Sequence, residues 1–330
     1  MTEKLIKKKL SLHEPTLAAR VILGEVNAVA RAISLIENRS TKVKELVSEL
    51  YPYTGKASII GITGAPGSGK STLVDRLATV IRSTGRSVGI LAIDPTSPFS
   101  GGAILGDRIR MSSHWNDQDV FIRSMATRGH LGGVALATGD AALILDAMGK
   151  ETIVIETVGV GQDEVEIIGT ADVSVVTLLP DAGDNIQALK AGIMEIADIF
   201  IVNKSDLPGA DSTVESVQAM LELQEYLPGA WRPPVIKTRA TNNQGVDVLW
   251  EEINKFIDCC PELLAKRRRA REENRLRKIF ESKLTTKLED TFSVRELSLL
   301  VDAVAARKTD PYTAVAEALK NKPAHSDSQS

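Results

Sequence analysis

Residues 64–71 read G-A-P-G-S-G-K-S, which fits the pattern G-x-x-x-x-G-K-[ST]. The backbone N–H groups of such a loop, together with the N-terminus of the following helix, can surround the oxygens of a phosphate chain. In this pattern Lys70 reaches the β- and γ-phosphates, and the Ser71 hydroxyl is a magnesium ligand. The apolar run before the motif and the amphipathic segment after it supply the strand and helix that the pattern requires. We therefore expect a phosphate-binding loop made of Gly64, Ala65, Pro66, Gly67, Ser68, Gly69, Lys70, Ser71 and Thr72.

A second motif, N-K-S-D at 203–206, indicates which base is bound. It follows an apolar run and so lies at the carboxyl end of a strand, where open α/β sheets bind ligands. Asp206 can accept hydrogen bonds from N1–H and the exocyclic amino group of guanine together, whereas adenine has neither donor there. Asn203 is expected to hold the loop and the base edge, and the stem of Lys204 to cover the base.

The segment T-R-A at 238–240 stands where GTPases usually have a Ser-Ala pair that contacts the base. Arginine takes the place of the serine. We therefore expect only Ala240 to contact the base.

Carboxylates at the ends of two other strands are candidates for magnesium binding and catalysis. Glu156 ends an apolar run, and Gly159 follows three residues later, which is the layout of Walker B and switch II with glutamate in the usual aspartate position. Such a carboxylate can hold magnesium through water, and the Gly159 N–H can sense a γ-phosphate. Asp94 and Asp107 can join the magnesium shell or orient the attacking water, but Asp94 can also begin an Asx-Pro turn and Asp107 can cap a helix. The expected catalytic set is Lys70, Asp94, Glu156 and Gly159, and the expected magnesium set is Ser71, Asp94, Asp107 and Glu156.

The residue that directly follows Gly159 is Val160, and the nearest glutamine is Gln162. A group that positions water is therefore absent until a loop moves, which predicts slow intrinsic hydrolysis.

Short apolar, β-branched runs alternate with amphipathic segments from residue 56 onward, as is typical of a parallel sheet flanked by helices. The expected strands are 57–63, 87–93, 120–124, 152–156, 173–178, 199–202 and 234–237. Helical spacing of apolar residues predicts helices within 16–36, 45–50, 266–287, 293–307 and 311–320. The sequence thus predicts an α/β fold of the P-loop NTPase class. Its expected parts are a helical N-terminal extension (1–55), a GTPase domain (56–260) and a helical dimerisation extension with a disordered tail (261–330).

Composition excludes several other classes of protein. The 330 residues include 43 acidic and 40 basic side chains, so the formal charge of -3 provides no general attraction for nucleic acid or anionic lipid. No apolar stretch approaches the ~20 residues that span a bilayer, and residues 1–10 do not form a signal or transit peptide. We expect a cytoplasmic protein that binds neither membrane nor nucleic acid. The basic run 266–269 is interpreted as a solvated or dimer-facing helix, and the apolar positions after it favour self-association.

Together these segments resemble the MeaB/ArgK-type subfamily of the G3E P-loop GTPases over residues 15–320. The motifs that carry the resemblance are 64–71, 93–95, 106–111, 203–206 and, as the most distinctive, E-T-V-G-V-G-Q at 156–162. The resemblance implies a magnesium-dependent enzyme that binds GTP and GDP, usually as a homodimer. It implies a chaperone for an adenosylcobalamin-dependent acyl-CoA mutase, typically methylmalonyl-CoA mutase, that gates cofactor loading and protects or reactivates the mutase. It also implies that the loop 179–190 acts as a third switch.

Two alternatives remain open. A G3E GTPase for nickel or zinc insertion would need grouped cysteine or histidine ligands, whereas the histidines at 13, 114, 130 and 325 are scattered and the only cysteines are adjacent, at 259 and 260. An older label, transport-associated ATPase or kinase, also attaches to sequences of this subfamily, but the N-K-x-D motif argues against ATP.

Overall fold

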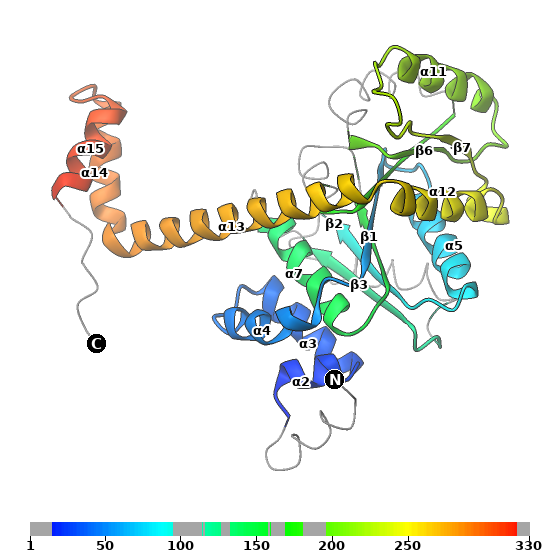
Figure 1. The fold of residues 1–330 in the computed structure, drawn as a ribbon. Coiled ribbons are helices and arrows are strands. Elements are labelled where there is room, and N and C mark those ends of the chain that lie inside the picture. Colours follow the sequence, from blue (N-terminus) through cyan, green and yellow to red (C-terminus); the bar gives the residue numbers. More distant parts are fainter. Residues whose placement is uncertain are drawn as a thin grey trace. The chain divides into compact units, whose positions relative to one another are not determined.

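Seven parallel strands form one sheet in the order β3-β2-β4-β1-β5-β6-β7 (Figure 1). This computed structural model describes residues 15–94, 114, 116–126, 133–157, 159, 169–180 and 196–321. The strands are β1 (Ser58–Gly64), β2 (Val88–Asp94), β3 (Val120–Ala126), β4 (Thr152–Thr157), β5 (Val173–Leu178), β6 (Ile199–Val202) and β7 (Val235–Lys237). The expected α/β class is therefore confirmed.

Helices cover both faces of the sheet, which is why the central strands are apolar at nearly every position. All residues of β4, β5 and β6 are buried. On one face, α5 (Lys70–Ser83) and α12 (Val246–Cys259) share a core with Val154, Val173 and Val175. On the other face, α7 (Gly133–Ala147) packs over Ile153 and Ile155. Helix α11 (Ala210–Glu222) shares a third core with residues of β5 and β6.

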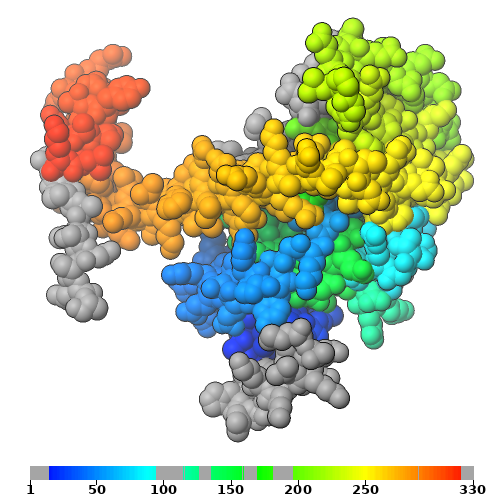
Figure 2. Space-filling model, in the orientation of Figure 1, coloured from blue at the N-terminus to red at the C-terminus, as the bar shows by residue number. Residues whose placement is uncertain are grey.

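The N-terminal helices are part of the same core as α7. Helices α2 (Leu17–Ile22), α3 (Val26–Glu37) and α4 (Val43–Leu50) bury their apolar faces in the cluster that contains α7 and β4 (Figure 2, blue). The helical pattern of 16–36 is divided between two helices because Gly24, with φ 79°, interrupts it. Arg123 of β3 fastens α3 by donating to Ser34 Oγ at 3.0 Å and to the Glu37 carboxylate.

Two buried aspartates hold the amino ends of β5 and β6. Asp172 immediately precedes β5 and is 1% exposed, and its carboxylate accepts a hydrogen bond from Ile59 N–H of β1 at 3.1 Å. Asp198 precedes β6 and is 3% exposed, and it accepts from Ser174 N–H of β5 at 2.8 Å. A buried carboxylate needs further partners, because an unpaired charge in the interior is costly.

Arginines of the long helix α13 (Pro261–Thr291) supply those partners. Arg267 donates to both oxygens of Asp198, at 2.6 and 2.7 Å. Arg268 and Arg271 bind Asp172, at 3.1 and 3.3 Å. Burial nevertheless raises the pKa of Asp198, whereas the hydrogen bond to Asp172 raises the pKa of Arg268. The interpretation of the basic run as solvated or dimer-facing is therefore wrong for these arginines, which hold the start of α13 against the sheet.

The chain divides into two compact units, Met1–Arg271 and Glu272–Ser330. The second unit contains the rest of α13, α14 (Val294–Ala305) and α15 (Pro311–Asn321). A capping box between Ser293 and Glu296 starts α14. Within the part of the chain that the structure describes, no helix combines the length and the apolar character needed to cross a membrane.

Replacing Asp172 tests the network between α13 and the sheet. Asp172→Ala removes the carboxylate that accepts from Ile59 N–H and pairs with Arg268 and Arg271, so we expect the free energy of unfolding to fall by about 2–4 kcal/mol. Urea denaturation followed by circular dichroism measures this. Asp211→Ala is the matched control, because its side chain is 82% exposed and pairs with Lys237 at the surface, which contributes at most about 1 kcal/mol. Equal destabilisation by the two substitutions would contradict a structural role for the network.

Candidate nucleotide site

The loop 65–69 joins the carboxyl end of β1 to α5, so the strand and helix expected around it are both present. Gly64 opens the loop with φ 150°, and a Cβ on it would lie 2.1 Å from the backbone oxygen of Thr177 in β5. Gly69 closes the loop at the N-cap of α5 with φ 86°, and a Cβ there would lie 2.4 Å from Asn203 Nδ2. Both positions therefore require glycine, because the loop is pressed against neighbouring segments as well as left-handed.

The ammonium group of Lys70 lies at the phosphate loop. The side chain is 5% exposed, and Nζ donates to the backbone oxygens of Gly64 at 2.7 Å and Ala65 at 3.0 Å. The first residue of α5 thus brings a positive charge to the helix N-terminus, where the helix dipole also favours anions.

Ser71 and Glu156 face one another across the site. Ser71 Oγ of α5 donates to Glu156 Oε1 at the end of β4, at 2.5 Å, and Glu156 is 8% exposed. A hydroxyl and a carboxylate in this position are the oxygen donors that Mg²⁺ takes when phosphates and water complete its shell. The donor set fits magnesium.

The side chains of the other two expected magnesium ligands, Asp94 and Asp107, lie outside the described part of the structure. Asp94 ends β2, beside β4 in the sheet, but only its backbone is described. Asp107 lies outside the described residues, as do Val160, Gln162 and residues 181–190 of the expected third switch.

Two threonines fix the start of the expected switch II, one inside the E-T-V-G-V-G-Q motif and one just before the phosphate loop. Thr157 follows Glu156 and donates to the hydroxyl of Thr63 at 2.9 Å. Thr63 in turn donates to the backbone oxygen of Gly159 at 2.6 Å. Both threonines are at most 2% exposed, so this chain of hydrogen bonds ties Gly159 to β1 in the interior.

His114, on the segment before β3, packs against the same face of α5 as Asp75. Its Nε2 lies 3.1 Å from the backbone oxygen of Asp75 and 3.4 Å from Oδ1. The hydrogen bond to Asp75 raises the pKa of His114. The pair ties residue 114 to the second turn of the helix that begins at the phosphate loop.

Asn203 connects three loops at the other side of the site. Its Nδ2 donates to the backbone oxygen of Ser68 at 2.8 Å. Its Oδ1 accepts from Thr238 Oγ1 at 3.0 Å and from Ala240 N–H at 3.2 Å. The N-K-S-D loop, the phosphate loop and the segment 238–240 are therefore joined by one side chain that is 2% exposed.

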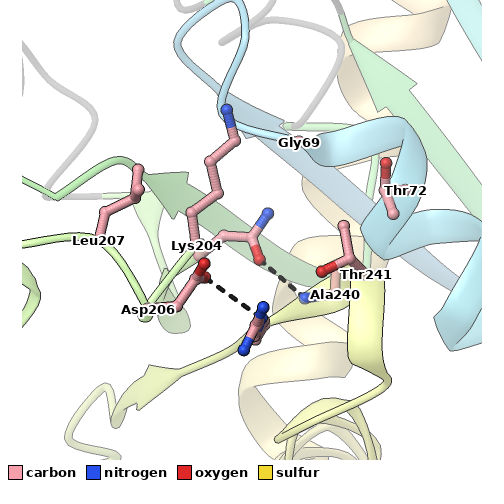
Figure 3. A pocket seen from close by; sticks show the side chains of 9 residues that line it. Gly69, Thr72, Lys204, Asp206, Leu207, Ala240 and Thr241 are labelled. Carbon is pink, nitrogen blue, oxygen red and sulfur yellow. Dashed lines mark hydrogen bonds and ion pairs between the residues drawn. The ribbon is translucent and has the colours of Figure 1, made fainter.

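These three loops enclose a pocket of about 180 Å³ (Figure 3). The lining residues are Gly69, Thr72, Asn203, Lys204, Asp206, Leu207, Arg239, Ala240 and Thr241. Lys204 has φ 56°, and its side chain runs toward Gly69, whereas Asp206 lies beneath it in the same view. The structure thus brings the expected base contacts together next to the phosphate loop. It adds Arg239, which the motif comparison left out, as an ion-pair partner of Asp206 at 3.5 Å.

A parallel sheet with a G-x-x-x-x-G-K-S loop between β1 and α5 and N-K-x-D after β6 defines a P-loop GTPase. The family described as methylmalonyl Co-A mutase-associated GTPase MeaB matches residues 29–292. The chain belongs to this family, within the G3E class of GTPases, and it is an enzyme that binds and hydrolyses GTP.

Two relatives and one solved structure illustrate the family likeness. A Pyrococcus abyssi protein that carries the word GTPase in its name is 47% identical over 309 residues, which cover 92% of this chain and 95% of that protein. The mouse protein named methylmalonic aciduria type A homolog, mitochondrial, is 34% identical over 257 residues, which cover 72% of this chain and 61% of that protein. A crystal structure of an LAO/AO transport system kinase matches with a TM-score of 0.69 at 23% identity, over 97% of this chain and 98% of that one. This last likeness concerns the fold alone and confirms the P-loop NTPase class.

The contact of Gly69 with Asn203 can be tested with a matched pair of glycines. Gly69 and Gly85 have φ 86° and 83°, but a Cβ on Gly85 meets nothing within 4 Å. We expect Gly85→Ala to cost about 1–2 kcal/mol of unfolding free energy through backbone strain alone. Gly69→Ala should cost about 1–3 kcal/mol more, because it displaces the buried amide of Asn203.

Urea denaturation of the nucleotide-free protein measures both costs, and GDP titration measures the effect on binding. Only Gly69→Ala should weaken the binding of GDP. Indistinguishable variants would mean that the contact with Asn203 is unimportant.

Proposed function

We propose that this GTPase is a chaperone for an adenosylcobalamin-dependent acyl-CoA mutase, and specifically for methylmalonyl-CoA mutase. In this role GTP binding and hydrolysis gate loading of the cofactor and protect or reactivate the mutase. The observation that carries the proposal is the match to the mutase-associated family from α3 to the end of α13. The match includes helices that precede and follow the GTPase core in the sequence. The name of the mouse relative, which refers to methylmalonic aciduria, supports the same partner.

The proposed nucleotide is GTP or GDP, with the phosphates at residues 64–72 and the base in the pocket beside Asp206. Lys70 would bind phosphate oxygens in place of the two backbone oxygens that it now contacts. Asp206 would accept from both donors on the guanine edge, whereas Asn203 holds the loops around it. Ala240 lines the pocket, and its small side chain would leave room for the base.

The proposed metal is Mg²⁺, held by Ser71 and Glu156, with Asp94 and Asp107 as further members of the set. Bound magnesium would supply positive charge that neutralises the charge developing on the phosphate oxygens. The hydrogen bond of 2.5 Å between Ser71 and Glu156 keeps both oxygens at the end of β4. Gly159, fixed by Thr63, would present its N–H to the γ-phosphate side of the site.

The proposed assembly is a homodimer formed through the second unit. That unit exposes large apolar side chains, including Phe280 (66%), Leu284 (65%), Val301 (65%) and Tyr312 (88%). Exposed apolar surface of this extent is typical of a protein interface. The loop 179–190 would relay the nucleotide state to the mutase, since it continues directly from β5.

Insertion of nickel or zinc is the second candidate function. Among the described residues, no group of three or more His, Cys, Asp or Glu side chains could hold such an ion. A transport-associated ATPase is disfavoured by the carboxylate of Asp206 in the base pocket, because adenine lacks both the N1–H and the amino group at C2 that guanine offers to it.

Asp206→Ala tests the choice of base. The carboxylate should contribute a bidentate, charge-assisted contact to guanine only, so we expect GDP affinity to fall about 10- to 100-fold and ADP affinity to stay the same. Lys70→Ala, by contrast, should weaken GDP and ADP alike and abolish turnover. Calorimetric titration of both nucleotides against the three proteins measures these effects. Equal affinity of the unchanged protein for GDP and ADP would overturn the guanine site.

Coupling to the mutase provides the test of the chaperone role. We expect the cognate mutase to accelerate single-turnover GTP hydrolysis. It should also change nucleotide affinity by the same factor by which the nucleotide changes mutase affinity, because binding linkage is reciprocal. Identical hydrolysis rates with and without the mutase would count against the proposal.

Affinity capture from native lysate, with a GTP analogue bound, identifies the partner independently. A B12-dependent mutase subunit among the captured proteins supports the proposal. Capture of a nickel enzyme or a transporter's binding protein would favour the alternatives and leave the GTPase assignment intact.

A further inference from the structure

Arg239 occupies a fixed position in the wall of the base pocket. Its backbone N–H donates to the oxygen of Gln244 at 3.0 Å, and Gln244 N–H donates back to its oxygen at 3.2 Å. The next residue, Ala240, is held by Asn203. The backbone on both sides of the arginine is therefore tied to the loops that form the pocket.

The side chain of Arg239 points to the carboxylate expected to bind guanine. Its Nε lies 3.5 Å from Asp206 Oδ1, which is the ion pair drawn as a dashed line from Asp206 in Figure 3. The Nε atom is buried and makes no hydrogen bond to the described residues, and the Asp206 carboxylate lies within ion-pair distance of it. The side chains of Arg239 and Asp206 are each 40% exposed, which leaves the carboxylate accessible to a ligand.

We propose that Arg239 is a specificity-determining residue that positions the Asp206 carboxylate for guanine. The inference rests on the proposed guanine site and adds a residue to it. A carboxylate has about four lone-pair sites, so Oδ1 can face Arg239 and still accept one guanine donor while Oδ2 accepts the other. The arginine thus replaces, with a longer and charged group, the serine that usually precedes the alanine in this segment.

The physical reason is preorganisation. The side chain of an aspartate on an exposed turn can rotate. A ligand that needs both carboxylate oxygens then binds more weakly, because binding must fix that side chain at a cost in entropy. A cation held on an anchored backbone segment selects one orientation of the carboxylate before guanine arrives. Arg239 would instead compete with guanine if it covered both oxygens, whereas the ion pair joins its Nε to Oδ1, at 3.5 Å.

Comparison of GDP with IDP separates positioning from simple charge. IDP lacks the exocyclic amino group, so the ratio of GDP to IDP affinity reports how well Asp206 meets both donors. We expect Arg239→Ala to lower GDP affinity about two- to fivefold, which is the effect of losing a partly exposed ion pair. The ratio of GDP to IDP affinity should fall with it, ADP affinity should not change, and Arg239→Lys should restore part of the loss.

Lys237→Ala is the matched control, because this nearby cation pairs with Asp211 outside the pocket. It should leave the affinities of all three nucleotides unchanged. In the Asp206→Ala background, Arg239→Ala should have no further effect on GDP affinity, since the group that it positions is gone.

Calorimetric titration of these variants separates the two levels of the argument. Discrimination that survives Asp206→Ala overturns the guanine site and with it the role of Arg239. Discrimination that depends on Asp206, combined with equal or tighter GDP binding by Arg239→Ala, overturns the positioning role alone. Equal melting temperatures of Arg239→Ala and Lys237→Ala exclude misfolding as the cause of any loss.

Discussion

The carboxamide of Asn203 is the contact on which the nucleotide site depends. It donates to the phosphate loop, through Ser68, and accepts from residues 238–240 at the same time. An aspartate would offer no donor to Ser68, and an apolar residue would leave three buried partners unsatisfied. Because Gly69 allows the amide to come so close, the loop for the phosphates and the pocket for the base share one wall.

A second polar network lies at the opposite ends of the same strands. There the carboxylates of Asp172 and Asp198 join β5 and β6 to the arginines of α13. Strand β5 runs from this network to the segment that leads into the proposed third switch, and all its residues are buried. Strand β6, whose residues are also all buried, runs from Asp198 to Asn203, so a close-packed element connects the two networks. The start of α13 therefore pairs with the amino ends of β5 and β6, whereas the candidate nucleotide site lies at the carboxyl ends of the strands.

Strands and motifs could be predicted from the sequence because their signals are local. The seven strands were expected within about two residues of their observed ends, since buried parallel strands are continuous apolar runs. Helix α7 is apolar on all sides and has no amphipathic pattern to reveal it. The ion pairs of Arg267 and Arg268 join residues 69 and 96 positions apart, and no periodicity reports such a distance. The roles of Thr63 and Arg239 likewise follow only from which loops the fold brings together.

The strand order also decides when the phosphate loop can form during synthesis. β1 leaves the ribosome first, yet it lies between β4 and β5, and its Ile60 pairs with Val154 and Val173, the latter more than a hundred residues later. At translation rates of about 5–20 residues per second, the apolar β1 waits roughly 5–19 s for β4, with both edges unpaired. Non-local pairing of this kind folds slowly and exposes strand edges to other chains. A protein proposed to assist another enzyme is therefore itself exposed to wrong pairing of β1 with other chains during each round of synthesis.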